Sequence, residues 1–111
     1  MIKELGKISH VHFGFHPDRP FLFGLELSFS GSGWGVETAG AYMINMSEDC
    51  KAWKDNPAER QRCVTENLDK IREIMKKANI KNIASLKGIP VEVTFNDDFR
   101  FESFRVLEEV L

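Results

Sequence analysis

The sequence lacks the features that mark secreted and membrane proteins. Among its 111 residues only Cys50 and Cys63 are cysteines, and residues 1–7 contain no apolar segment of the kind found in secretory signals. No apolar run approaches the roughly 18 residues that a membrane span needs. We therefore expect no disulfide scaffold, no membrane segment and a cytoplasmic protein with reduced thiols.

An excess of charge of one sign is missing as well. The net charge is −2, so no overall field would draw the chain to nucleic acid or to anionic lipid. The charges are unevenly placed, because residues 51–81 hold nine basic side chains against five acidic ones, whereas residues 88–111 hold two against six. This asymmetry does not by itself identify a partner.

Phenylalanine, in contrast, is abundant: the chain has nine Phe against two Trp and one Tyr. A chain of this length has room for one hydrophobic core. We therefore predict a single domain over residues 1–111. Most of the Phe residues should lie in its core, since each buried Phe contributes about 1.5–3 kcal/mol.

Two segments near the N-terminus alternate apolar with polar or small residues. Val11, Phe13 and Phe15 belong to the first, and residues 21–29 place Phe or Leu at every odd position. The turn signal between them, residues 16–20, is too short for a parallel crossover. The pattern predicts an antiparallel hairpin with its apolar side chains on one face.

A third strand is predicted over residues 36–44, followed by a long helix. Asn56 is suited to cap this helix, with Pro57 at its first position and Glu59 where a capping box requires an acid. Asn79 can end it in a left-handed conformation. The predicted apolar stripe consists of Val64, Leu68, Ile71, Met75 and Ala78.

After the helix, the sequence predicts a helical turn over residues 82–87, a strand over 91–95, a turn at 96–98 and a returning strand over 99–107. The predicted fold is therefore α+β: an antiparallel sheet of four to five strands, with one main helix packed on one face. The order of elements is ββ(β)–α–ββ.

The last predicted strand carries apolar residues of both parities. Phe99, Phe101 and Leu107 fall on one face of a regular strand, and Phe104 and Val106 on the other. A single helix covers one face of a sheet. We therefore expect a second copy or another partner to cover the remaining face, and predict a homo-oligomer, with a homodimer as its simplest form.

The candidate binding site is a glycine-rich segment, formed by Gly31, Ser32, Gly33, Trp34 and Gly35. Glycine-rich loops can bind phosphate through backbone N–H groups. However, the Gly-Lys-Ser/Thr ending of a P-loop is absent, and a strand rather than a helix follows. A hairpin turn or bulge also explains the glycines. Trp34 has two interpretations, a residue that caps the core or a contact residue at the loop tip.

Two histidines suggest an alternative site. His10 and His12 share one face of the first strand and could begin a zinc site with His16, Asp18 or Cys50. The sequence has no second His-x-His pair, no Cys-x-x-Cys and no His-Glu-x-x-His to complete it. Solvent-exposed strand histidines are the simpler interpretation. A metal-dependent enzyme using His10 and His12 remains the third functional hypothesis.

Neither cysteine indicates an activated nucleophile. Cys63 adjoins the apolar stripe of the helix and is expected to pack there, and Cys50 has acidic neighbours, which disfavour a thiolate. We therefore expect no enzymatic activity and no cofactor.

The outer face of the helix mixes both signs of charge, with Glu66–Lys70 and Glu73–Lys77 spaced for ion pairing. This mixture is typical of a solvated face. Binding of nucleic acid is the second functional hypothesis. It would depend on the basic residues Arg60, Arg62, Lys76, Lys77 and Lys81.

Several short motifs resemble small uncharacterised proteins encoded by bacteriophages and prophages. They are Gly33-Trp34-Gly35-Val36, the segment from Leu86 to Glu92, the segment from Leu107 to Leu111, and Phe13-Gly14-Phe15. The resemblance implies a phage accessory protein in the bacterial cytoplasm, with no catalytic residues to carry over. Proteins in that setting often act by binding, and some inhibit host anti-phage defence by occupying a host protein or trapping a signalling nucleotide. The leading hypothesis is accordingly a non-enzymatic binding protein.

Overall fold

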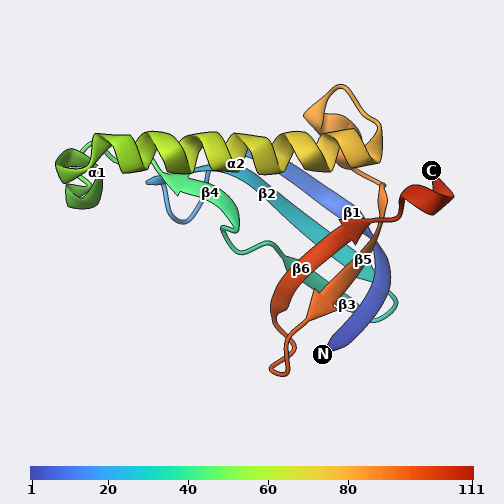
Figure 1. Cartoon of the computed structure of the whole chain (residues 1–111). Coiled ribbons are helices and arrows are strands. Elements are labelled where there is room, and N and C mark those ends of the chain that lie inside the picture. Colours follow the sequence, from blue (N-terminus) through green and yellow to red (C-terminus); the bar gives the residue numbers. More distant parts are fainter.

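A computed structural model describes residues 1–51 and 53–111 in full, and there the chain forms a six-stranded antiparallel sheet and one long helix (Figure 1). The strands are β1 (Ile2–Phe15), β2 (Leu22–Gly31), β3 (Trp34–Glu37), β4 (Tyr42–Asn45), β5 (Pro90–Phe95) and β6 (Phe101–Val106). The helices are α1 (Lys51–Asp55), α2 (Pro57–Ala78) and the 3₁₀ turns η1 (Ile83–Leu86) and η2 (Glu108–Val110). The predicted fold class is confirmed.

The strands follow the order β3-β2-β1-β5-β6, and β4 pairs with β2 along the same edge as β3. The predicted third strand is thus two short strands, because a turn at Thr38 interrupts it. The Thr38 carbonyl accepts from the amide of Ala41 at 3.0 Å, and its buried hydroxyl accepts from the amide of Leu27 at 3.2 Å. A side chain therefore takes the place of a ladder bond at the break.

The predicted hairpin of β1 and β2 is confirmed, with Val11 opposite Leu27 and Phe13 opposite Leu25. A bulge at Ser9 shifts the register, and the first half of β1 pairs with β5 instead. β1 is therefore the central strand for only part of its length.

The sheet curves strongly around its core. Phe29 of β2 contacts both Phe101 and Phe104 of β6, with ring centroids 5.6 Å and 4.8 Å apart, although two strands separate β2 from β6. Figure 1 shows β6 crossing in front of the strands at the other end of the sheet. The concave face holds the buried core, and α2 packs across it.

The strand β6 does not carry two apolar faces, which corrects the expectation from its sequence. Phe101 pairs with Phe95, whereas Ser103 pairs with Thr94, so a bulge at Glu102 adds one residue to β6. The bulge brings Phe101 onto the same side as Phe104. β6 therefore leaves no apolar face for a partner to cover, and the predicted homo-oligomer needs other support.

The ends of α2 are those predicted. The Asn56 side chain accepts from the amide of Glu59 at 3.1 Å, and Asn79 ends the helix in the left-handed region with φ of 56°. The carboxylate of Glu59 turns to Arg62 rather than back to Asn56, so only half of the capping box forms.

In the described part of the chain, no helix has both the length and the apolar character needed to cross a membrane.

The buried face of α2 differs from the predicted stripe, and it includes Ile74, which the prediction left out. Ile71 and Ala78 are buried as expected, but Leu68 is 56% exposed and the neighbouring Asn67 is buried instead. The Asn67 side chain donates to the backbone carbonyl of Tyr42 at 3.0 Å. This bond joins α2 to β4 and satisfies a polar group that the helix covers.

Asn67 should matter more to stability than its place outside the predicted stripe indicates. We expect Asn67→Ala to lower the free energy of unfolding by about 0.5–1.5 kcal/mol, because it removes the buried hydrogen bond that joins α2 to β4. Gln61→Ala, on the exposed side of the same helix, should change it by less than about 0.5 kcal/mol. Urea denaturation measures both, and equal effects would contradict the assigned role of Asn67.

Candidate functional site

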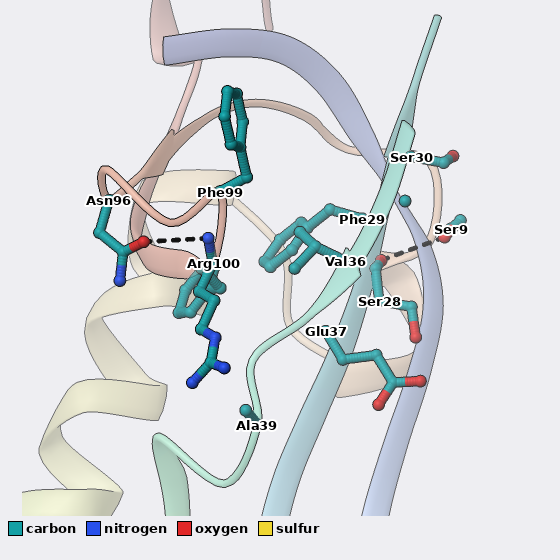
Figure 2. A pocket seen from close by; sticks show the side chains of 12 residues that line it. Ser9, Ser28, Phe29, Ser30, Val36, Glu37, Ala39, Asn96, Phe99 and Arg100 are labelled. Carbon is teal, nitrogen blue, oxygen red and sulfur yellow. Dashed lines mark hydrogen bonds between the residues drawn. The ribbon is translucent and has the colours of Figure 1, made fainter. Parts of the chain in front are cut away.

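The candidate site is an open groove of about 800 Å³ between β3 and the turn that joins β5 to β6 (Figure 2). We call it the seam groove. Phe29, Val36 and Phe101 form its apolar floor, while Glu37 on β3 and Arg100 on the turn lie at its two sides. The groove exists because curvature brings the two ends of the sheet close together without pairing them.

The β5–β6 turn holds its residues in place at the groove. The Asn96 side chain accepts from the backbone amide of Asp98 at 2.9 Å and from that of Arg100 at 3.0 Å, the second of which is drawn in Figure 2. Phe99 has φ of 60° and is 69% exposed. An exposed aromatic ring on an ordered turn is the kind of residue that anchors binding partners.

The exposed edge of β3 offers backbone groups to a ligand. The amide of Thr38 donates to the carbonyl of Leu27 at 3.0 Å, so the backbone N–H and C=O groups of Thr38 point toward β2. In an antiparallel ladder this direction alternates, and the backbone groups of Gly35 and Glu37 therefore point away from β2. Both residues are exposed and line the seam groove.

The segment predicted as the binding site forms the β2–β3 hairpin. Its turn is at Ser32 and Gly33. Gly33 has φ of 78°, in the left-handed region where a side chain would be strained and glycine is favoured. Gly35 lines the seam groove, whereas Gly31, Ser32 and Gly33 lie outside its lining. The binding role of the whole segment remains a prediction.

Trp34 packs against the core instead of projecting from the loop. Its indole meets Phe95 edge to face, with centroids 5.4 Å apart. A Cβ atom on Gly6 would lie 2.8 Å from the indole, and one on Gly31 would overlap it. These two glycines therefore form the flat surface on which Trp34 rests. This packing agrees with the interpretation of Trp34 as a residue that caps the core.

The histidines predicted as metal ligands lie apart from Cys50. His10 is exposed, and the Nε2 of His12 donates to the carbonyl of Phe15 at 2.7 Å. In the part of the chain that the structure describes, no three His, Cys, Asp or Glu side chains gather in a way that could hold a metal ion.

His16 forms a pair that the sequence analysis missed. Its Nδ1 accepts from the amides of Asp18 and Arg19, each at 3.1 Å, so Nε2 carries the proton and donates to Glu26 at 3.2 Å. Both ring nitrogens are engaged, which leaves none to act as a general base. The signal available in the sequence was Glu26, the one charged residue in an otherwise apolar and small strand.

Burial raises the pKa of the Glu26 carboxyl above its ordinary value of 4.5, and a hydrogen bond to the Glu37 carboxyl raises it further. The positive potential of His16 opposes these effects. The pair thus joins the β1–β2 turn to the convex face of the sheet, and Glu37 connects it to one side of the seam groove.

The remaining predicted residues are dispersed. Cys50 and Cys63 are half-buried free thiols. Arg62 is held by Glu59 and Glu66, and these carboxylates raise the pKa of its guanidinium. Part of the basic charge proposed for nucleic acid is therefore compensated within α2.

The contact between Trp34 and Gly31 can be tested by a double-mutant cycle. Gly31→Ala should lower the free energy of unfolding by about 1–3 kcal/mol, because the added methyl group overlaps the indole. In a Trp34→Ala background the same substitution should cost much less. Denaturation of the four proteins gives the coupling, and an equal cost in both backgrounds would show that the indole does not rest on Gly31.

The raised pKa of Glu26 predicts a pH dependence of stability. The folded protein holds this proton at pH values where the unfolded chain has released it, so the contribution of Glu26 to stability falls as the pH rises above 4.5. Glu26→Gln cannot titrate and should gain stability relative to the wild type between that pH and neutrality. Urea denaturation across this range is the measurement, and a constant difference would contradict the raised pKa.

Comparison with known proteins gives no relative from which a role for the seam groove could be inferred. No protein-family model matches the chain, and neither the curated proteins nor the solved structures contain a detectable match.

Proposed function

We propose that the chain is a non-enzymatic binding protein that holds an extended segment of a partner protein in the seam groove. The observation that carries this proposal is the combination of an exposed strand edge with an aromatic floor. An added strand gains affinity from main-chain hydrogen bonds and specificity from alternate side chains that enter pockets.

The groove supplies both parts of that recognition. The outward groups of Gly35 and Glu37 are spaced two residues apart, as a pairing strand requires. Every second side chain of the bound segment would then face Val36 and Phe101, both half-buried. We therefore expect the segment to alternate apolar and polar residues.

A protein segment suits the groove better than a signalling nucleotide does. Among the described lining residues, Arg100 is the one cation and Glu37 the one carboxylate. A phosphate ligand needs several positive or N–H donor groups directed at it, and a carboxylate nearby opposes its binding. The balanced charge of the groove favours a ligand without a concentrated negative charge.

The resemblance to phage-encoded proteins extends this proposal. The partner would be a protein of the bacterial host, met in the cytoplasm, and binding would inhibit its part in anti-phage defence. The alternatives of nucleic-acid binding and metal-dependent catalysis gain no comparable support, since Arg62 is compensated and His12 is bonded to the backbone.

A photo-cross-linking amino acid in place of Phe99 tests the site. Because this side chain is exposed beside the seam groove, it should capture a bacterial protein from lysate. The same amino acid in place of Phe21, which is 46% exposed elsewhere, should not capture that protein. Mass spectrometry identifies the product, and equal capture at both positions would contradict a partner in the groove.

The captured partner, once purified, allows a sharper test with Gly35→Pro. Proline removes the outward N–H of Gly35 without touching the bonds between β3 and β2. We expect binding about 10-fold weaker or more, since an unpaired backbone acceptor costs about 1–3 kcal/mol. Ser32→Pro, in the turn of the same hairpin, is the matched control and should bind as the wild type does. Unchanged affinity of Gly35→Pro, measured by calorimetry, would rule out strand addition at β3.

A further inference from the structure

The second half of β1 has a strand beside it on one side only. β5 pairs with residues 2–7, and the chain then turns away after Ile8 bonds to Gly88 at 2.7 Å and to Ile89 at 3.0 Å. From His10 to Phe15, the strand pairing in the described residues is with β2 alone. This leaves an open strand edge, distinct from the seam groove.

The groups that face this edge follow from the ladder with β2. The amide of His16 donates to the carbonyl of Leu22 at 2.9 Å. Because the direction alternates along an antiparallel strand, the backbone groups of Gly14 and His12 also point toward β2. Val11 and Phe13 therefore direct both N–H and C=O outward. The outward carbonyl of Phe15 already accepts from His12 at 2.7 Å.

This edge has few of the features that protect edge strands from pairing with another chain. Edge strands are normally shielded by Lys, by Pro or by an inward charge. Residues 10–15 contain none of these, and Phe13 and Phe15 are 46% and 60% exposed. Such an edge is suited to pairing with another strand.

We propose that β1 pairs with β1 of a second copy, antiparallel, about a two-fold axis at His12. This register places Val11 opposite Phe13 of the second copy, and Phe13 opposite Val11. Since both residues direct their backbone groups outward, the two copies exchange four hydrogen bonds and the two sheets become one. The outward groups are symmetric about His12, which is the condition for an interface between identical copies.

The side chains on the concave side support the same pairing. Phe13 lines an apolar cavity of about 170 Å³ between the hairpin and α2, together with Leu68 and Ile71. A second groove, of about 510 Å³, continues from these two helix residues to Met75. In the pair, Phe13 would cover Val11 and Leu68 of the other copy. Leu68 would then be buried, as its place in the apolar stripe of α2 predicts.

Identical copies suit this edge better than a strand of another protein. A strand of another protein would need two apolar residues in the matching register and no charged residue beside them. A second copy of this chain meets these conditions with Val11 and Phe13.

Sedimentation velocity tests the proposal, with Phe13→Lys as the variant. The wild type should reach the mass of two 12.7 kDa chains as its concentration is raised, and Phe13→Lys should keep the mass of one. Phe13 contacts the ring of Phe23 in the single chain, with centroids 5.5 Å apart, so the variant should melt somewhat lower at low concentration but still unfold in a cooperative transition. Phe99→Lys, which replaces a more exposed Phe in the β5–β6 turn, should still form the pair, as should Gly35→Pro.

Amide hydrogen exchange then identifies the interface. The amides of Val11 and Phe13 should be protected in the wild type and exchange rapidly in Phe13→Lys, whereas those of His12 and Gly14 should be protected in both. A wild type that remains a single chain would overturn the proposal. So would a dimer in which the Val11 and Phe13 amides exchange rapidly, because its interface would lie elsewhere.

Discussion

The contact of Phe29 with Phe101 and Phe104 determines the shape of the molecule. Aromatic pairs of this kind contribute about 0.5–1.5 kcal/mol each beyond the apolar area that they bury. Here they join strands that are far apart in the order of the sheet, so they favour a curved sheet over a flat one. The concave face that results holds the core. The two ends of the sheet then approach one another, and the seam groove is the space that remains between them.

Local signals predicted much of this fold. Period-two alternation identified the β1–β2 hairpin, and Asn56 and Asn79 identified the ends of α2, because caps and turns depend on a few neighbouring residues. The bulge at Glu102 was not predictable in this way. It depends on which residue of β5 each residue of β6 meets, and parity within one strand carries no such information. The exchange of Leu68 for Asn67 has the same origin, since the Tyr42 carbonyl that Asn67 meets belongs to a distant strand.

Only the part of the candidate site that has a local sequence signal was predictable. The glycine-rich segment drew attention to Gly35, which lines the seam groove, but gave no indication of Phe99 and Arg100. Their turn meets β3 only because the sheet curves. Trp34 illustrates the converse case: a Trp between glycines suggested a contact residue, whereas Gly31 is small because the indole lies on it.

The break at Thr38 divides one edge of the sheet into two strands with different attachments. β4 is tied to α2 through Asn67 and to α1 through Trp53, whose indole donates to the Asn45 carbonyl at 2.6 Å. β3 has no comparable tie to a helix among the described residues, and is held by its hairpin and by the packing of Trp34. The two segments of this edge thus differ in what holds them, β4 by the helices and β3 by the sheet alone. In the proposed complex, a small shift of β3 toward its partner strand would break no bond to the helical layer.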